Sequence, residues 1–187
     1  MSKNIILYIA ASLDGFIARK NGSVDWLAPY EKGQEDYGYN EFYKKIGTVI
    51  MGNNTYKQVL TFGEFPYRGK DCFVFSRNKD NVKDENVIFV NRSAKDFISQ
   101  LNLRNNKNIW LVGGASIVDE FLKSDLIDEF IITIIPILLG DGIPLFKGRS
   151  NETKLELIDV KRFDSGLVQL HYFRSSMDTY LHSSIPQ

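Results

Sequence analysis

The stretch Ile109-Trp110-Leu111-Val112-Gly113-Gly114-Ala115-Ser116 carries the strongest structural signal in this chain. An apolar run of strand character ends in two glycines, and a helix-period segment begins at once. Glycine adopts backbone angles that side chains forbid, and it lets a ligand approach the main chain. The unpaired N–H groups at the start of a helix favour an anion. The stretch predicts either a phosphate-binding turn or a tight strand-to-helix turn without a ligand. It lacks the three spaced glycines of the Rossmann fingerprint.

Two further strand ends carry groups that suit an anion. The segment Thr48–Tyr56 meets a glycine and then asparagines and a threonine that can cap a helix. The segment Phe73–Arg77 ends in a hydroxyl and a guanidinium, which can hold a phosphate through two hydrogen bonds. Simple capping and a solvated arginine are the alternatives. Open α/β sheets bind ligands at the carboxyl ends of their strands, so three such ends favour one ligand across that edge. The residues concerned at these two ends are Gly52, Asn53, Thr55, Ser76 and Arg77.

Apolar runs of strand length alternate with helix-period segments along the chain. This alternation predicts an α/β fold with a central mixed, mostly parallel sheet of about eight strands flanked by four helices. Residues 1–174 form one domain, and residues 175–187 form a tail or an arm that contacts a partner. The turn Asp164-Ser165-Gly166 joins the last two strands into an antiparallel hairpin. The predicted strands are Ile5–Ala10, Thr48–Met51, Cys72–Ser76, Val87–Val90, Ile109–Val112, Glu129–Ile137, Leu155–Phe163 and Val168–Arg174.

Apolar residues at helical spacing mark the four helices. The first is closed by Gly47. The third and fourth begin with capping boxes, Ser93 with Asp96 and Ser116 with Asp119. The apolar positions are Tyr39, Phe42, Tyr43 and Ile46; Tyr56, Val59 and Leu60; Ala94, Phe97, Ile98 and Leu101; and Ile117, Phe121 and Leu122.

Composition excludes several classes of protein. Lys and Arg together number 23, as do Asp and Glu, so the chain lacks the basic excess of a nucleic-acid-binding domain. The longest apolar run, Ile131–Leu139, contains a proline and falls short of the roughly 20 residues of a membrane-spanning helix. A single cysteine, Cys72, fits a cytoplasmic, reducing compartment. With no spaced pair of His or Cys ligands, no metal site is expected.

Six segments occur in the order found in the dihydrofolate reductase-like superfamily, and the resemblance covers roughly residues 3–174. The Ser-Leu-Asp-Gly and Pro-x-Leu-Leu-Gly motifs resemble the reductase domain of the bifunctional riboflavin biosynthesis deaminase-reductase more than dihydrofolate reductase itself. The zinc-binding His and Cys pattern of a deaminase is missing, so the resemblance implies the reductase step alone. The segments are Ala10-Ala11-Ser12-Leu13-Asp14-Gly15-Phe16-Ile17-Ala18, Val24-Asp25-Trp26-Leu27, Met51-Gly52-x-x-Thr55-Tyr56, Ser76-Arg77, Val112-Gly113-Gly114 and Pro136-Ile-Leu-Leu-Gly140-Asp141-Gly142.

The resemblance implies NADPH bound along the strand ends and a mobile lid, Arg19–Trp26, over its nicotinamide. It also implies a homodimer, in which Ile131–Leu139 could help form the interface. The family often has an arginine where this chain has Asn53, so the preference for NADPH over NADH depends mostly on Arg77. The implied contacts are Ala10 and Ile17 on the nicotinamide side; Gly113, Gly114, Ala115 and Ser116 on the pyrophosphate; and Gly52, Asn53, Thr55, Ser76 and Arg77 around the adenosine phosphate.

Reduction of a C=N bond needs a hydride at carbon and a proton at nitrogen. The resemblance to dihydrofolate reductase points to a carboxylate among Asp25, Glu31, Glu35, Asp36 and Glu41, with Asp36 the preferred candidate. The resemblance to the riboflavin-pathway reductase points instead to Asp14, which could equally be a plain turn residue. Trp26 either lines the substrate pocket or anchors the lid. Lys147 and Arg149 are the candidates for binding a substrate phosphate.

The residues and the resemblance together indicate an NADPH-dependent reductase of a pyrimidine or pterin-like substrate. The nearest activity is 5-amino-6-(5-phosphoribosylamino)uracil reductase. Dihydrofolate reductase is the alternative enzyme. A non-catalytic nucleotide-binding protein is the alternative of another class, because a fold does not fix a function.

Overall fold

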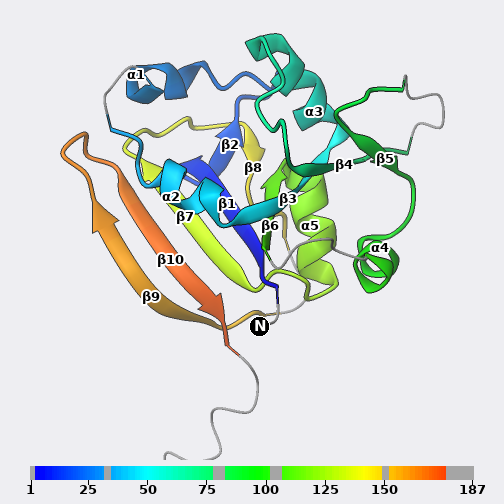
Figure 1. The fold of residues 1–187 in the computed structure, drawn as a ribbon. Coiled ribbons are helices and arrows are strands. Elements are labelled where there is room, and N and C mark those ends of the chain that lie inside the picture. The colour runs from blue at the N-terminus through cyan, green and yellow to red at the C-terminus, as the bar shows by residue number, and fades with distance from the viewer. Residues whose placement is uncertain (1–2, 32–34, 78–82, 102–106, 149–151, 176–187) are drawn as a thin grey trace, which may run out of the picture.

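A computed structural model describes residues 3–31, 35–77, 83–101, 107–148 and 152–175. One eight-stranded sheet runs through it in the order β5-β4-β3-β6-β1-β7-β10-β9 (Figure 1). Neighbouring strands are parallel, except that β10 runs antiparallel to both β7 and β9. The predicted fold class is confirmed. The strands are β1 Ile5–Ser12, β3 Ile46–Gly52, β4 Asp71–Phe75, β5 Ile88–Val90, β6 Asn108–Gly113, β7 Glu129–Ile135, β9 Leu155–Arg162 and β10 Val168–Arg174.

The sequence did not predict a second, two-stranded sheet formed by β2 (Phe16–Ala18) and β8 (Ile143–Pro144). These strands are too short to show a periodic pattern. Their approach requires a glycine, because a Cβ at Gly142 would lie 2.4 Å from the carbonyl oxygen of Ala18. The pairing draws the segment after β7 back over the end of β1.

Four helices flank the large sheet, as predicted: α2 (Tyr39–Lys44), α3 (Asn53–Val59), α4 (Ala94–Gln100) and α5 (Ala115–Lys123). Short turns of helix, η1 (Asp25–Leu27), α1 (Ala28–Glu31) and η2 (Leu60–Phe62), were not predicted. The cap of α4 is confirmed, because Ser93 Oγ accepts the N–H of Asp96 at 3.1 Å.

Three predicted helix ends were wrong. The N-cap of α5 is Gly114, two residues before the predicted cap, so Ser116 lies inside the first turn and does not cap the helix. In α3 the N-cap is Gly52, and neither Asn53 nor Thr55 caps the helix through its side chain. The helix α2 ends at Lys44, and Gly47 belongs to β3 instead. In each case the cap residue lies one to three positions before the polar residues or glycine that the sequence pattern predicted.

The core has two halves, one on each face of the sheet. The helices α4 and α5 pack on one face, where Leu7, Leu111 and Phe121 are fully buried. The helices α2 and α3 cover the other face, where Phe42 and Trp110 lie in an aromatic cluster. Cover on both faces explains why the residues of β3 from Ile46 to Met51 are all buried.

The C-terminal hairpin forms as predicted. Gly166 has φ 86°, and its N–H donates to the carbonyl oxygen of Phe163 at 2.9 Å. The predicted tail lies outside the described residues, apart from Ser175. Within the described ranges, no helix is both long enough and apolar enough to cross a membrane.

Candidate active site

Two glycine turns meet at the carboxyl end of the sheet. Because β3 and β6 are neighbours, a Cβ at Gly52 would lie only 3.8 Å from the carbonyl oxygen of Gly113. A Cβ at Gly114 would lie 3.3 Å from Thr55 Oγ1. Gly113 has φ 124°, which favours glycine, and its peptide bond to Gly114 is cis. Glycine carries no side chain, so a ligand can approach the main chain at both turns.

The amino end of α5 brings N–H groups and a lysine to the same place. The N–H groups of Ile117 and Val118 both donate to Gly114, so the N–H groups before them point out of the helix. Lys147 Nζ lies 3.3 Å from Ser116 Oγ. A cation beside the positive end of a helix dipole is unfavourable alone, and an anion between them removes that cost. The arrangement suits a phosphate group. The predicted partner of Lys147, Arg149, lies outside the described residues.

The third predicted strand end reaches the same edge. Gly52 pairs with Phe75 across β3 and β4, so Ser76 and Arg77 follow beside the first glycine turn. Ser76 is buried and its N–H donates to Val90, whereas Arg77 is exposed. The structure therefore brings together nine of the predicted residues: Gly52, Asn53, Thr55, Ser76, Arg77, Gly113, Gly114, Ala115 and Ser116.

Ala10, Ile17 and Trp26 lie near the end of β1 but do not form one cluster. Trp26 is 4% exposed and packs with Ile135 and Leu167, and Ala10 packs against the same group. Ile17 packs against the core on the α5 face. Trp26 Nε1 is buried and has no acceptor among the described residues. Its burial favours the role of an anchor for the preceding loop over that of an open pocket wall.

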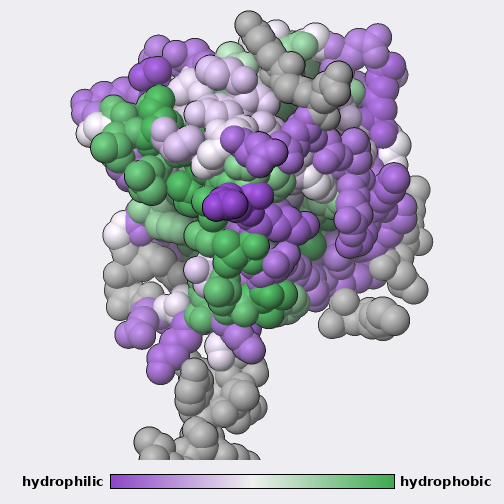
Figure 2. All heavy atoms as spheres, turned by 90° about the vertical axis from the view of Figure 1, so that its left-hand side faces the viewer, coloured by the Kyte–Doolittle hydropathy of each residue, from purple (hydrophilic) through white to green (hydrophobic). Residues whose placement is uncertain are grey.

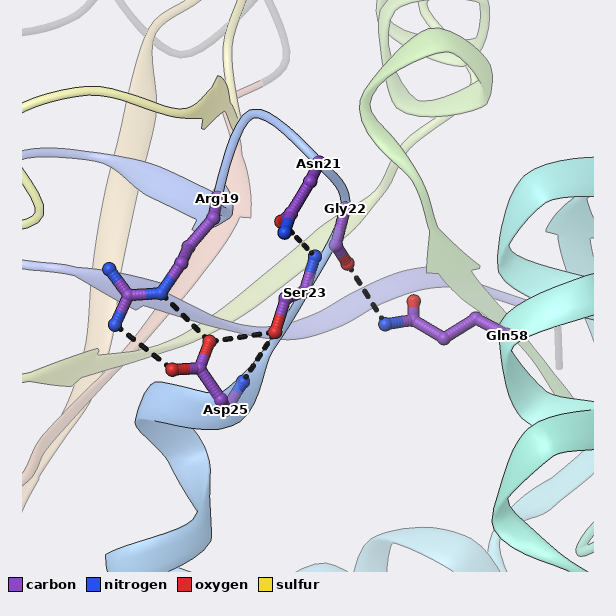
Figure 3. Close-up of polar contacts among 6 residues, drawn as sticks. All are labelled: Arg19, Asn21, Gly22, Ser23, Asp25 and Gln58. Carbon is purple, nitrogen blue, oxygen red and sulfur yellow. Dashed lines mark hydrogen bonds and ion pairs between the residues drawn. The ribbon is translucent and has the colours of Figure 1, made fainter.

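The expected lid, Arg19–Trp26, is fastened by its own side chains (Figure 3). Asp25 accepts two hydrogen bonds from Arg19, at 2.8 and 3.1 Å, and one from Ser23 Oγ at 2.7 Å. The hydrogen bond from Arg19 is the largest of several causes that lower the pKa of Asp25 to about 2. Gln58 on α3 donates to the carbonyl oxygen of Gly22 at 3.1 Å. The loop is therefore tied to the helix that follows the first glycine turn, and Asp25 holds the loop.

The two preferred carboxylates also hold main-chain groups. Asp14 accepts Ser12 Oγ–H at 2.6 Å and the N–H groups of Gly140 and Leu139 at 2.7 and 3.1 Å. These bonds lower its pKa, with Ser12 the largest cause. Asp36 accepts the N–H groups of Gly38 and Asn40 at the start of α2, and the Gly38 bond contributes most to lowering its pKa.

The other predicted carboxylates offer no better acid. Glu41 pairs with Lys45 at 2.8 Å, Glu35 is exposed, and the side chain of Glu31 lies outside the described set. A carboxylate that is ionised and holds hydrogen-bond donors is poorly suited to deliver a proton. The geometry therefore favours structural roles for Asp14 and Asp36, in which each carboxylate holds main-chain N–H groups in place.

Residues 3–169 match the family model of the RibD C-terminal domain. The chain belongs to this family. It is 49% identical over 176 residues to "Uncharacterized protein YwjB" of Bacillus subtilis strain 168, covering 94% of this chain and 100% of that protein. A crystal structure of a putative riboflavin biosynthesis protein from Shewanella sp. PV-4 superposes with a TM-score of 0.84 at 34% identity, covering 92% of this chain and 99% of that one.

A dihydrofolate reductase from Enterococcus faecalis complexed with NADP(H) superposes with a TM-score of 0.64 at 15% identity, covering 92% of this chain and 97% of that one. This likeness concerns the fold alone. The chain is thus a RibD reductase-like protein with a dihydrofolate reductase-like fold.

Sequence analysis missed a buried pair of polar residues in this RibD C-terminal domain. Ala10, Thr133 and Gln169 lie side by side on β1, β7 and β10. Thr133 and Gln169 are each 7% exposed, and Gln169 Nε2 donates to Thr133 Oγ1 at 3.1 Å. A signal was present, because each polar residue interrupts an apolar strand. The strand pattern could not show that the two meet, since they are 36 positions apart.

Proposed function

We propose that this RibD C-terminal domain protein is an NADPH-dependent reductase of a pyrimidine or pterin-like compound. The nearest activity is that of 5-amino-6-(5-phosphoribosylamino)uracil reductase. The proposal is carried by one observation: three strand ends, two of them bare glycine turns, meet at one edge of the sheet beside the start of α5 and Lys147. The binding of NADP(H) by a dihydrofolate reductase of the same fold supports this choice of cofactor.

In this proposal each strand end holds one part of the cofactor. The turn Gly113–Ser116 holds the pyrophosphate, because its glycines let a ligand approach the main chain and the first N–H groups of α5 point out of the helix. Gly52, Asn53 and Thr55, with Ser76 and Arg77, surround the adenosine phosphate. Ala10 and Ile17 border the nicotinamide. The cofactor supplies the hydride when bound, and the protein supplies position and electrostatics.

The carboxylates act in this proposal by holding the site in shape. Asp14 ties the turn after β1 to the loop at Gly140. Asp36 starts α2, and Trp26 fixes the end of the lid. The alternative, a dihydrofolate reductase that uses Asp36 as its substrate carboxylate, is disfavoured because both oxygens of Asp36 accept backbone N–H groups.

Replacing Asp36 with asparagine tests the choice between the two enzymes. We expect turnover to fall less than tenfold, since the amide oxygen can still accept one backbone N–H group. General acid catalysis would make the loss about a hundredfold or more. The measurement is steady-state NADPH oxidation with dihydrofolate and with the ribosylaminouracil phosphate. Efficient dihydrofolate turnover that collapses in the variant would reverse the preference.

A homodimer is also proposed, with a different surface from the one expected. The strand β7 is paired on both sides, so Ile131–Ile135 has no free edge. A group of exposed apolar side chains lies on the edge strand β9, where Leu155, Leu157, Ile158 and Val160 are 39–54% exposed. Figure 2 shows apolar atoms gathered on the side of the molecule where β9 and β10 lie. Patches of this kind mark association sites.

The double substitution Leu157→Glu and Val160→Glu is expected to convert the dimer to a monomer. Both residues lie on one face, opposite Tyr172 and Leu170 of β10, so the change places two charges in the proposed interface. Size-exclusion chromatography with light scattering measures the mass. Lys161→Glu, on the other face of β9, is the control and should stay dimeric. A monomeric wild type, or a dimeric double variant, would count against this interface.

A cytoplasmic location remains the expectation for a chain with a single cysteine, which is buried.

A further inference from the structure

A groove of about 330 Å³ lies between α2 and the β1, β7, β10 and β9 half of the sheet. This volume is at the lower end of the range for small-molecule sites. Ile6 and Ile131 of neighbouring strands line it, and Phe42 of α2 faces them. Tyr8 and Gln169 also line it. Tyr8 lies two residues before Ala10 on the same face of β1, and Gln169 is in register with Ala10 through Thr133, so both lining residues lie near the residue proposed to border the nicotinamide.

The side-chain oxygen of Gln169 is available as a hydrogen-bond acceptor. Gln169 Nε2 donates to Thr133 Oγ1 at 3.1 Å and has longer contacts with the carbonyl oxygen of Tyr37 and with Tyr8 Oη, at 3.4 and 3.5 Å. These three hydrogen bonds between described residues use its Nε2 and not its Oε1. The Oε1 atom is not among the fully buried side-chain atoms of the described residues that lack a partner, so it is open to the groove, where water or a ligand can donate to it.

Tyr8 supplies a donor beside this acceptor. Its ring stacks on Phe42 with the centroids 4.2 Å apart, and its hydroxyl reaches the carbonyl oxygen of Tyr37 only at 3.4 Å. Burial is the largest cause that raises the pKa of Tyr8, so the hydroxyl keeps its proton. Gln169 Nε2 lies 3.5 Å from Tyr8 Oη, so both side chains line the same part of the groove and offer it one donor O–H and one acceptor C=O.

Three carboxylates line the groove, and each already accepts a hydrogen bond. Glu129, which is 8% exposed, accepts Asn4 Nδ2 at 2.5 Å, and its other oxygen lies 3.1 Å from His171 Nε2. Glu41 pairs with Lys45 at 2.8 Å, and Asp159 accepts the N–H of Val160 at 2.9 Å. The residue opposite Gln169 on β9 is Lys161, and a cation there disfavours a protonated amidine edge beside Gln169.

We propose that Gln169 and Tyr8 recognise a neutral amide edge on the substrate, that is, the adjacent C=O and N–H of a lactam or carboxamide. The substrate carbonyl accepts from Tyr8 O–H, and the substrate N–H donates to Gln169 Oε1. Thr133 is a positioning residue, because it holds the amide of Gln169 in this orientation. The assignment depends on the proposed function, and it selects lactam rings over diaminopyrimidine rings.

The test compares two probes on protein saturated with NADP⁺: 5,6-diaminouracil, which has a lactam edge, and 2,4-diaminopyrimidine, which has an amidine edge. Ligand-observed NMR gives both dissociation constants. We expect wild type to bind the uracil at least tenfold more tightly. Gln169→Glu should shift this ratio at least tenfold towards the diaminopyrimidine, because a carboxylate attracts the amidine. Tyr8→Phe should weaken only the uracil, about tenfold.

Gln100→Glu, an exposed residue of α4 on the opposite face, makes the same change of charge and should leave the ratio unchanged. A wild type that prefers the diaminopyrimidine or does not bind the uracil would overturn the proposal. So would an unchanged ratio in both Gln169→Glu and Tyr8→Phe. These outcomes leave the cofactor site intact when NADPH still binds. A wild type that does not bind NADPH would defeat the proposed function instead.

Discussion

Replacing Gly114 with valine is expected to weaken NADPH binding at least tenfold, which corresponds to about 1.4 kcal/mol. The Cβ alone would lie 3.3 Å from Thr55 Oγ1, and the two methyl groups of valine would fill the space that the pyrophosphate needs. The φ of Gly114 is −79°, which valine can adopt, and Thr55 has to shift by a few tenths of an ångström to admit the Cβ. A loss of affinity in a folded variant would therefore place the ligand at this turn and its neighbour Thr55.

Isothermal titration calorimetry of wild type and variant measures this loss, with circular dichroism to check the fold. Ser124→Val is the matched control, because Ser124 lies at the opposite end of the same helix α5. The NADPH affinity of the Ser124→Val protein should equal that of the wild type. Unchanged NADPH affinity in a folded Gly114→Val protein would show that the pyrophosphate does not bind at this turn.

Replacing Arg77 with alanine is expected to weaken NADPH binding roughly tenfold to a hundredfold and to change NADH binding little. A hydrogen bond to a charged group contributes about 1.5–3 kcal/mol, and only NADPH carries the 2′-phosphate that Arg77 would hold. Asn53 cannot replace this charge. The exposed position of Arg77 after β4, beside the first glycine turn, fits a role at the outer end of the cofactor.

Dissociation constants for NADPH and NADH, measured on wild type and Arg77→Ala, test whether Arg77 distinguishes the two cofactors. Arg68→Ala is the control, since Arg68 precedes β4 at its other end and pairs with Glu64. It should affect neither cofactor. Equal losses for NADPH and NADH in Arg77→Ala would show that Arg77 does not distinguish them.

The sequence was sufficient to predict which strand ends meet at the edge that we propose for the cofactor, because each of its signals is local. A strand that ends in glycine and enters a helix is contained within a few residues, as in Val112–Ser116 and Met51–Thr55. Parallel order then brings the ends of β3, β4 and β6 to one edge. No knowledge of distant contacts was needed.

The role of Asp14 could not be predicted, because two of its partners are remote. Asp14 holds the N–H groups of Leu139 and Gly140, which are 125 and 126 positions away. In the sequence it is one acid in a turn, and a catalytic role was as plausible as a structural one. Lys147 likewise meets Ser116 only because β8 pairs with β2, and neither strand is long enough to be recognised.

Amide chemical shifts in ¹⁵N-labelled protein during a titration with NADPH test the central claim most directly. We expect the largest changes at the N–H groups of Gly52, Gly113, Gly114, Ala115 and Ser116, with smaller changes at Ser76 and Arg77. The amides of β9, at the far edge of the sheet, should not move. Saturable changes confined to other parts of the sheet, or none at millimolar NADPH, would contradict the account.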